Sequence, residues 1–386
     1  MRFFIIAGEQ SGDLHGSNLV RGLLEADKDA EIFCWGGDLM ESAGAKLLMH
    51  YRKLAFMGFV AVIKNLGAIR KNLSLCKQQI IEYKPDVIIF IDYAGFNIRI
   101  AEFARNAGFK TFYYISPKYW AWNEGRVEKI KKYIDRMFII FPFEVEFYRK
   151  HGIVVDYNGN PLVDETEKRI ATFPPKENIY KLLGIKKKPV IALLAGSRRH
   201  EIELVLPEMI KTVHHFPDYQ FVLAGVKNIS NDIYLNVIGN EPVILIKEKT
   251  YEILFVAEAA LVTSGTATLE AALMGTPQVV CYKGDFLSMI IAWMVIKVKY
   301  ISLVNLIMES EVIKELVQYD LKAKTLINEL KAILPAGAKR EKILLDYEVL
   351  KDKLGPAGAS ARIAKEMVEE LKERMGEGEK GRIGEE

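Results

Sequence analysis

Short apolar runs alternate along the chain with longer segments in which apolar residues recur every three or four positions. The short runs predict strands that are buried on both faces, and the longer segments predict helices that cover them. Up to about residue 160, strands are predicted at residues 2–7, 30–35, 86–91, 110–115 and 136–141. Helices are predicted at residues 11–24, 38–44, 58–82, 96–107 and 126–132. This alternation is typical of an α/β protein with a doubly wound parallel sheet.

The alternation begins again after residues 171–177, where two adjacent prolines interrupt any helix and indicate a connection between domains. Further strands are predicted at residues 189–194, 219–224, 243–246, 259–263 and 278–281. Residues 309–374 carry mostly helical patterning, and the end of the chain is rich in glycine and charge. We therefore expect one domain at 1–170, a second at 171–340 facing it across a cleft, helices at 341–375 and a disordered tail at 376–386.

The composition is that of an ordinary globular protein, with 50% hydrophobic and 27% charged residues among 386. A net charge of +3 on a chain of this length predicts no binding to nucleic acid. The three cysteines form no Cys-x-x-Cys pair, which argues for a reducing compartment and against zinc, and no other metal site stands out. The first apolar run meets Glu9 too soon for a signal peptide, so we expect a cytoplasmic protein.

Residues 286–296 are almost entirely apolar but too few to cross a bilayer, which takes roughly 20 residues. They fit a buried or interface helix. They also fit a surface that meets lipid or a partner chain, because Lys297 and Lys299 follow and suit anionic headgroups.

In open α/β sheets, ligands bind beyond the carboxyl ends of the strands, so the residues after each strand matter most. Gly8 opens such a loop, whose glycine spacing is neither the Rossmann fingerprint nor a P-loop. Glu9, Ser11 and Asp13 follow near a helix start, where acidic and hydroxyl groups suit sugar hydroxyls. Ser11 or Asp13 also fits a simple helix cap.

Asp92 ends a buried strand, a position that suits a general base, although a lone aspartate there also fits a helix cap. The strand at 110–115 leads into Ser116 and then Trp120 and Trp122. These rings fit a stacking platform for a sugar, an apolar wall for acyl chains, or a plug in the core.

The second half offers two loops that suit a diphosphate. Gly196, Ser197 and Arg198 follow a strand, and a guanidinium there binds phosphate in a bidentate fashion or is simply a surface arginine. Glu201 is expected to cap the helix that follows. The other loop begins after the strand at 259–263.

That second loop is the strongest single element of the sequence. Ser264, Gly265 and Thr266, followed by Ala267 and Thr268, place backbone N–H groups and hydroxyls at a helix start that favours pyrophosphate. One turn further on, Glu270 is placed to accept both ribose hydroxyls of a nucleotide. The alternative is an ordinary capped helix with an exposed glutamate.

Nine short segments, in order from residue 1 to about residue 320, resemble one known family. They are Ala-Gly-Glu-x-Ser-Gly-Asp (7–13), Met-Gly (57–58), Ile-Asp-x-x-x-Phe-Asn (91–97), Ile-Ser-Pro-x-x-Trp-Ala-Trp (115–122), Pro-Phe-Glu (142–144), Gly-x-Pro-Leu-Val-Asp (159–164), Gly-Ser-Arg-x-x-Glu (196–201), Ser-Gly-Thr-Ala-Thr-Leu-Glu (264–270) and Ser-Leu-x-Asn-Leu-Ile (302–307). The family is that of the lipid-A-disaccharide synthases. The resemblance implies a GT-B fold and a metal-independent, inverting sugar transfer with no cofactor. The implied donor is UDP-2,3-diacylglucosamine, and the implied acceptor is 2,3-diacylglucosamine 1-phosphate.

The resemblance also implies roles for single residues. Asp92 matches the general base, and Glu9, Arg198 and Asn305 match residues that the family needs for activity, Asn305 on the donor side. The implied acceptor and lipid side comprises Gly8, Ser11, Asp13, Met57, Asn97, Ser116, Trp120 and Trp122. The family is also similar in forming homodimers by exchange of C-terminal segments and in associating with the inner-membrane surface.

The sequence departs from the family pattern at three loops. Gly95 replaces a second aspartate after the base, which leaves a supporting carboxylate there in doubt, while Ala195 and Asn160 replace a proline and a histidine. The rival interpretation is another GT-B enzyme that binds a UDP-sugar: UDP-N-acetylglucosamine 2-epimerase or the transferase that glycosylates lipid-linked muramyl pentapeptide. The loops at 7–13 and 115–122 fit neither. A non-catalytic nucleotide-sugar-binding protein or membrane scaffold is expected to lack Asp92 or Arg198.

Overall fold

The computed structural model describes residues 1–54, 66–122, 124–284 and 298–383, and the chain forms two compact units. Unit 1 comprises Met1–Pro161 together with Pro356–Glu386, and unit 2 comprises Leu162–Gly355. The chain thus leaves unit 1 and returns to it at its C-terminal end.

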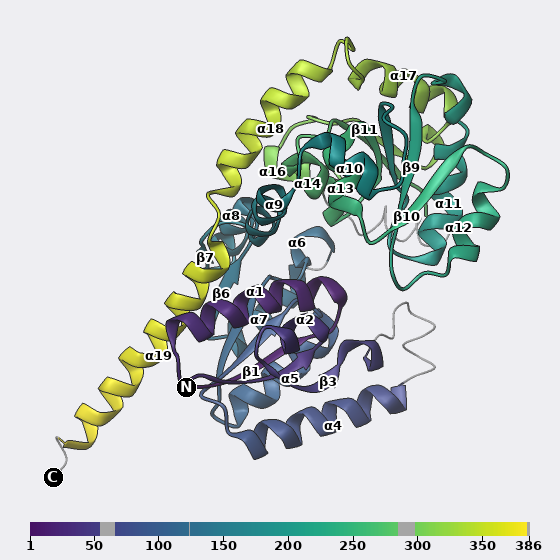
Figure 1. The fold of residues 1–386 in the computed structure, drawn as a ribbon. Coiled ribbons are helices and arrows are strands. Elements are labelled where there is room, and N and C mark those ends of the chain that lie inside the picture. Colours follow the sequence, from purple (N-terminus) through teal and green to yellow (C-terminus); the bar gives the residue numbers. More distant parts are fainter. Residues whose placement is uncertain (55–65, 123, 285–297, 384–386) are drawn as a thin grey trace. The chain divides into compact units, whose positions relative to one another are not determined.

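Unit 1 is built on a seven-stranded parallel sheet in the order β3-β2-β1-β4-β5-β6-β7 (Figure 1). Its strands are β1 (Arg2–Ala7), β2 (Glu31–Gly36), β3 (Lys46–His50), β4 (Val87–Ile91), β5 (Lys110–Tyr114), β6 (Arg136–Ile139) and β7 (Asp156–Tyr157). Its α-helices are α1 (Gln10–Ala26), α2 (Asp38–Ser42), α4 (Leu66–Tyr83), α5 (Ala94–Asn106), α6 (Tyr119–Trp122), α7 (Val127–Tyr133), α8 (Pro142–Lys150) and α19 (Ala359–Ile383), with 3-10 turns η1 (Tyr51–Lys53) and η2 (Glu124–Arg126).

The parallel sheet confirms the prediction from the apolar runs. Every residue of β4 is buried, as a central strand covered on both faces requires. The two strands that the apolar pattern missed, β3 and β7, are the edges of the sheet. Edge strands keep one side exposed and are only partly buried here, so they carry no continuous apolar run.

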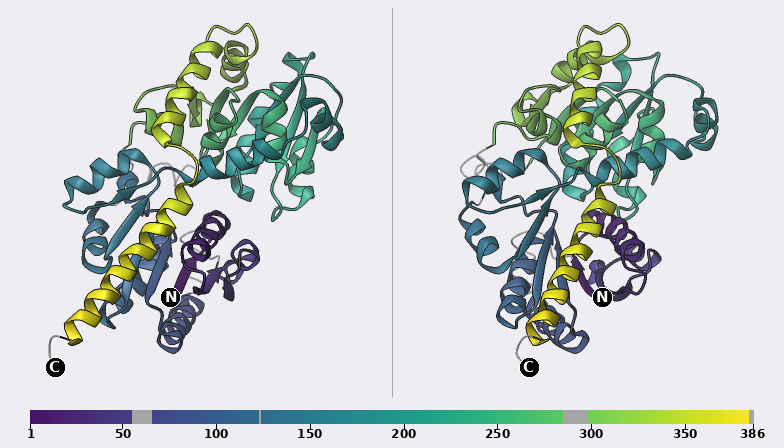
Figure 2. Two further views of the ribbon diagram at one scale, coloured as in Figure 1. Left: turned by 60° about the vertical axis from the view of Figure 1, so that its left-hand side comes forward. Right: turned by 90° about the vertical axis from the view of Figure 1, so that its left-hand side faces the viewer.

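Helix α19 packs along α1, and the two lie side by side in both views of Figure 2. The contact is close at Gly22, where a β-carbon would lie 2.8 Å from Cβ of Ala364. Small residues at this crossing let the two helix backbones approach. The helix continues to Ile383, through the glycine- and charge-rich residues for which the sequence predicts a disordered tail.

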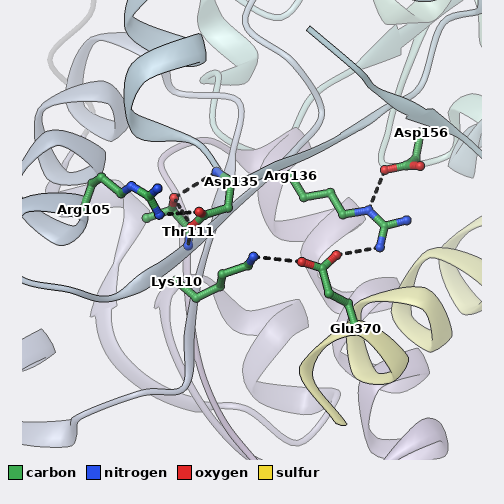
Figure 3. A network of polar contacts seen from close by, with 7 residues as sticks. All are labelled: Arg105, Lys110, Thr111, Asp135, Arg136, Asp156 and Glu370. Carbon is green, nitrogen blue, oxygen red and sulfur yellow. Dashed lines mark hydrogen bonds and ion pairs between the residues drawn. The ribbon is translucent and has the colours of Figure 1, made fainter. Parts of the chain in front are cut away.

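Ion pairs fix α19 to the sheet of unit 1 (Figure 3). Arg136 on β6 binds Glu370 at 2.6 Å and Asp156 at 2.7 Å, while Lys110 on β5 binds the other oxygen of Glu370 at 2.9 Å. Because the pairs are partly buried and share partners, the network holds the helix in one register.

Unit 2 contains a six-stranded parallel sheet in the order β10-β9-β8-β11-β12-β13. Its strands are β8 (Val190–Leu194), β9 (Gln220–Gly225), β10 (Val243–Lys247), β11 (Ala257–Thr263), β12 (Gln278–Tyr282) and β13 (Glu315–Val317). Helix α9 (Pro161–Thr172) begins at the boundary of the units, and the other helices are α10 (Lys176–Leu182), α11 (Arg199–Ile210), α12 (Asn231–Ile238), α13 (Thr250–Val256), α14 (Thr266–Leu273), α16 (Leu303–Met308), α17 (Ala323–Ile333) and α18 (Arg340–Leu354), with 3-10 turns η3 (Val213–His215) and η4 (Gln318–Asp320).

All five strands predicted for the second half are present, and β13 is an additional edge strand within the region of helical patterning. The two prolines of the expected interdomain connection instead join α9 to α10, and both helices belong to unit 2 from Leu162 onward. The prolines therefore end a helix without marking the boundary of a unit.

No helix within the described residues is long and apolar enough to span a membrane. The apolar stretch at 286–296 lies outside the described residues, as does Lys297.

Candidate functional site

Each sheet has one point at which the strand order reverses, and such a point is where open α/β sheets bind ligands. In unit 1 it lies between β1 and β4, where Ala7 pairs with Ile91. In unit 2 it lies between β8 and β11, where Leu194 pairs with Val262. Four of the loops singled out in the sequence follow these four strands directly, and the loop at Ser116 follows β5.

At the switch point of unit 1, the ring of Tyr93 covers Gly8. A β-carbon on residue 8 would lie 2.3 Å from Cγ of Tyr93, so only glycine fits under the ring. The hydroxyl of Tyr93 donates a hydrogen bond to the carbonyl of Leu54 at 3.1 Å, which fixes the ring in place. The loops after β1 and β4 are therefore packed against each other.

Asp92 sits in a strained backbone turn. It has φ 43°, and Tyr93 has φ 45°, both in the left-handed region that non-glycine residues rarely adopt. The carbonyl of Asp92 accepts hydrogen bonds from the hydroxyl of Tyr113 at 2.5 Å and from Nδ2 of Asn97 at 2.8 Å. Strain of this kind persists where surrounding contacts enforce it, and it is common at functional sites.

The electrostatics of Asp92 suit a base. Burial raises the pKa of its carboxyl group above the usual range, while the nearby charge of Lys118 and the backbone N–H of Tyr93 act in the opposite direction. A carboxylate with a raised pKa is a stronger proton acceptor, and Asp92 keeps partial exposure to the site.

The structure assigns the helix cap differently from the sequence. Glu9 is the N-cap residue of α1, and Ser11 lies exposed in the first turn. The carboxylate of Glu9 lies near the ring of Tyr93, and together with burial it raises the pKa of that phenol. Glu9 is thus placed at the switch point near Tyr93.

Asp13 caps a different helix from the one expected. Its carboxylate is buried and accepts hydrogen bonds from the backbone N–H groups of Gly37 (2.8 Å), Leu39 (3.1 Å) and Met40 (3.1 Å) at the start of α2. The side chain therefore ties α1 to the loop after β2.

Asn97 is also fully buried. Its Nδ2 lies within hydrogen-bonding distance of the carbonyls of Asp92 (2.8 Å), Ile91 (3.3 Å) and Ile6 (3.4 Å). These contacts support a role in fixing the ends of β1 and β4 rather than in touching an acceptor.

Ser116 and Trp120 both donate hydrogen bonds to the buried carboxylate of Glu144. The sequence pattern predicts no role for this residue. Ser116 Oγ donates a hydrogen bond to Oε1 of Glu144, Trp120 Nε1 donates to the same oxygen at 3.0 Å, and the N–H of Phe141 donates to Oε2 at 3.2 Å. Burial raises the pKa of Glu144 to about 7, against the effect of these hydrogen bonds. Met57 lies outside the described residues, and the side chain of Trp122 is likewise not described.

In unit 2, the loop after β8 is shaped around Glu201. Gly196 has φ 111°, and a β-carbon there would lie 2.6 Å from Oε2 of Glu201. That oxygen accepts hydrogen bonds from the N–H groups of Ser197 (3.0 Å) and Arg198 (3.3 Å), which confirms the predicted cap of α11. The side chain of Arg198 is exposed and meets Glu201 at 3.3 Å, so its guanidinium remains accessible to an anion.

The loop after β11 opens α14 with Gly265 as N-cap, at φ 154°. The first N–H groups of a helix have no partner within it, so those at Thr266 and Ala267 suit an anion. Ser264 Oγ donates to the carbonyl of Ile301 at 2.7 Å, and the buried hydroxyl of Thr268 donates to the carbonyl of Gly265 at 2.8 Å. These two hydroxyls hold the loop, whose residues Ser264, Gly265 and Thr266 are partly exposed.

Asn305, on α16, is fully buried and is connected to the Ser264 loop through other residues. Its Oδ1 accepts from the N–H groups of Val312 (2.9 Å) and Ile313 (3.0 Å), and its Nδ2 donates to Glu315 Oε1 at 2.9 Å. Glu315 in turn accepts from the N–H of Ile301 at 2.9 Å.

Since Ile301 is the residue whose carbonyl binds Ser264, Asn305 is linked to the loop at Ser264 through Glu315. Every polar atom of its side chain is occupied, so it positions the loop rather than touching a donor.

Glu270 lies one turn into α14 and is partly buried. Tyr251 on α13 donates a hydrogen bond to its Oε1 at 2.8 Å, and burial raises the pKa of the carboxyl group. Arg169 lies over the Tyr251 ring at 5.5 Å and binds Glu165 at 2.8 Å. Tyr251 therefore fixes the orientation of Glu270, a partner that local sequence patterns do not reveal.

Within the described residues, no group of three or more His, Cys, Asp or Glu side chains is arranged to hold a metal ion.

Comparison with known proteins decides the family. The sequence profile of the lipid-A-disaccharide synthetases matches residues 3–366. The chain belongs to the lipid-A-disaccharide synthetase family. The lipid-A-disaccharide synthase of Geobacter sulfurreducens is 36% identical over 377 residues, covering 96% of this chain and 97% of the relative. That of Syntrophus aciditrophicus is 37% identical over 368 residues, covering 93% and 95%.

Among solved structures, the UDP-GlcNAc 2-epimerase of Neisseria meningitidis bound to UDP-GlcNAc superposes with a TM-score of 0.66. It covers 96% of this chain and 100% of its own, at 13% sequence identity. This likeness shows the fold alone, and it confirms the GT-B fold expected of a lipid-A-disaccharide synthetase. The family match covers nearly the whole chain at far higher identity and favours the synthase over the epimerase.

Proposed function

We propose that the protein transfers 2,3-diacylglucosamine from UDP to the 6-hydroxyl group of 2,3-diacylglucosamine 1-phosphate. The products are the β-1,6-linked disaccharide 1-phosphate and UDP. The observation that carries this proposal is the family match over residues 3–366. The position of Asp92 at the switch point of unit 1, where burial raises its pKa, supports it.

In the proposed reaction, Asp92 accepts the proton of the acceptor 6-hydroxyl group. The oxygen forms a bond to C1 of the donor sugar, the bond between C1 and the diphosphate breaks, and UDP leaves. Attack opposite the leaving group inverts the configuration at C1, which needs one base and no covalent intermediate. Glu9, beside Tyr93, supports the proposal as a second polar group at the same switch point.

We assign the leaving diphosphate to the switch point of unit 2. The N–H groups that open α14 and the exposed guanidinium of Arg198 offer positive charge where negative charge develops as UDP departs. Glu270, oriented by Tyr251, is proposed to accept hydrogen bonds from the ribose hydroxyl groups. Asn305 contributes by fixing the Ser264 loop through Glu315.

Because both proposed substrates carry acyl chains, we propose that the protein works at the surface of the inner membrane, with the Trp120 segment on the acceptor side. Trp120 is buried with its indole N–H on Glu144, which fits a plug in the core or an apolar wall better than an open stacking platform.

We also propose that the protein forms a homodimer by exchanging its C-terminal segment. The chain returns to unit 1 through Gly355 and Gly358, at φ 78° and 91°, and α19 then binds the sheet through Arg136 and Lys110. A segment attached in this way fits either its own unit 1 or that of a second copy. Light scattering of the purified protein, with and without a truncation before Pro356, tests this arrangement.

The experiment that tests the reaction gives the purified protein both acylated substrates in the presence of a metal chelator. UDP release that depends on the acceptor, together with a β-1,6 disaccharide 1-phosphate identified by mass spectrometry and NMR, is the expected result. Release of UDP at the same rate without acceptor contradicts the proposal, and so does conversion of UDP-GlcNAc to its 2-epimer.

A further inference from the structure

Unit 1 contains a cavity of about 300 Å³ between the start of α4, helix α5 and the segment from η2 to α7. One part of its lining is apolar, with Ile69, Phe96 and Ile98. The other part is cationic, with Arg99, Arg126 and Lys129. A cavity that is apolar on one part of its lining and cationic on the other suits a molecule with an apolar part and a compact anionic group.

The charged side chains of the lining are all cationic. Three side chains carry positive charge, and none of the lining residues is acidic. Gly95, also in the lining, sits where a β-carbon would meet no atom within 4 Å, so the space beside it is open. Arg99 and Lys129 form no ion pair with any carboxylate in the part of the chain that the structure describes.

Guanidinium and ammonium groups gathered around one space are the usual ligands of phosphate in proteins. A phosphomonoester carries close to two negative charges at neutral pH, which three cations match better than the single charge of a phosphodiester.

The cavity borders the proposed base. Tyr93 lines it and directly follows Asp92 in the strained turn. Burial raises the pKa of the Tyr119 phenol, the nearby Arg126 acts against this effect, and the Asp92 carboxylate adds to it. Tyr93 and Tyr119 therefore connect the cavity to the proposed base.

We propose that this cavity binds the phosphomonoester of the acyl-sugar acceptor through Arg99, Arg126 and Lys129, with Ile69, Phe96 and Ile98 against the adjoining acyl chain. The proposal rests on the proposed function and adds to it the group by which the acceptor is recognised. It makes the protein selective for an acceptor that is phosphorylated at C1.

The test compares two acceptors, diacylglucosamine 1-phosphate and the same molecule with a free 1-hydroxyl group, in detergent micelles. The wild type is expected to prefer the phosphorylated acceptor by roughly tenfold or more in kcat/KM. In Arg126→Gln and Lys129→Gln, KM for the phosphorylated acceptor rises and the preference falls several-fold, while KM for the donor stays unchanged. A preference of wild-type size in both variants overturns the proposal.

Lys131→Gln is the matched control, because it removes the same charge from α7 at a residue that does not line the cavity. It is expected to keep both the acceptor preference and the donor KM. A loss of preference in this variant equal to that in Lys129→Gln shows a general charge effect and overturns the proposal.

Binding measurements separate this proposal from the reaction itself. Calorimetric titration with each acceptor in micelles, without donor, reports the phosphate contribution in the absence of turnover. If the wild type binds the phosphorylated acceptor preferentially but makes no disaccharide, the proposed function fails and the cavity assignment stands. If disaccharide forms without any preference for phosphate in binding, the cavity assignment fails alone.

Vesicles distinguish the acceptor phosphate from lipid headgroups in general. Sedimentation with phosphatidylcholine vesicles, with and without phosphatidylglycerol, measures attraction to phosphodiester surfaces. Lys129→Gln is expected to sediment like the wild type. Loss of vesicle binding together with an unchanged acceptor preference shows that the cations serve the membrane surface and overturns the proposal.

Discussion

The ring of Tyr93 lies directly over Gly8, so that a β-carbon on residue 8 would approach its Cγ to 2.3 Å. The two residues belong to loops that follow adjacent strands, β1 and β4, at the point where the strand order of unit 1 reverses. Asp92 immediately precedes Tyr93. A change at Gly8 is therefore transmitted through one aromatic ring to the backbone of the proposed base.

Gly8→Ala is expected to displace Tyr93 and, with it, the strained turn at Asp92. We predict a loss of about 1–3 kcal/mol in the free energy of unfolding, as for overpacking elsewhere, and at least a tenfold fall in kcat. Thermal unfolding and steady-state kinetics measure the two effects. Gly67→Ala is the control, because no atom lies within 4 Å of a β-carbon there. Equal activity in both variants contradicts the role of the Gly8 contact.

Lys118 sets the pH range in which Asp92 is ionised. Its charge lowers a pKa that burial raises, so Lys118→Gln is expected to raise the pKa of Asp92 further. A smaller fraction of the base is then ionised at acidic pH, and the acidic limb of the kcat/KM profile moves to higher pH while the plateau is retained. A profile that moves to lower pH, or a variant of the exposed Lys71 with the same shift, argues against this coupling.

Asn305 is predicted to act on donor binding without touching the donor. Asn305→Ala leaves the N–H groups of Val312 and Ile313 unpaired, which costs about 1–3 kcal/mol for each buried group left unsatisfied. It also removes one of the hydrogen bonds to Glu315, which keeps those from Ile301 and Ser302. The side chain of Glu315 is then held less firmly, and with it Ile301, whose carbonyl binds Ser264. We expect weaker UDP binding in calorimetry and unchanged acceptor binding. A variant that is less stable but binds UDP with wild-type affinity shows a purely structural role.

Glu144 makes stability depend on pH. Its pKa is raised by burial to about 7 in the folded protein, while an unfolded glutamate has a pKa near 4.5. Between these values the folded state binds more protons than the unfolded state, so stability falls as the pH rises from about 4.5 to about 7, by on the order of 1–3 kcal/mol. Glu144→Gln is expected to flatten this part of the profile in denaturant titrations at several pH values.

The exposed Glu146 lies on the same helix, α8, and Glu146→Gln serves as the control for Glu144→Gln. It is expected to keep the wild-type slope between pH 4.5 and 7. If Glu144→Gln keeps that slope as well, Glu144 ionises normally in the folded protein and the prediction is wrong.

The central strands and the loops that follow them could be predicted from the sequence, because strands covered on both faces need continuous apolar runs. This logic located Asp92, Arg198 and the loop at Gly265, and the structure puts each at a switch point. The edge strands β3, β7 and β13 were missed, because a partly exposed strand needs no continuous apolar run. The edge strand β10 was predicted because its residues 243–246 are all apolar.

The partners of buried polar groups could not be predicted, because they depend on contacts between distant segments. Asp13 was expected to cap its own helix or meet a sugar, yet it caps α2, 24 residues further on. Glu144 was noted only as part of a short motif, although Ser116 and Trp120 both bind it. Local spacing identifies a candidate residue but does not show which neighbours the fold brings to it.

The most direct test of the account is the turnover of Asp92→Asn with both acylated substrates. Asparagine keeps the shape of the side chain but cannot accept the hydroxyl proton, so kcat is expected to fall by roughly 10²–10⁴-fold while UDP binding is retained. Asp86→Asn, at the opposite end of β4 and exposed, is expected to turn over at the wild-type rate. Asp92→Asn with near wild-type kcat contradicts the assignment of Asp92 as the base.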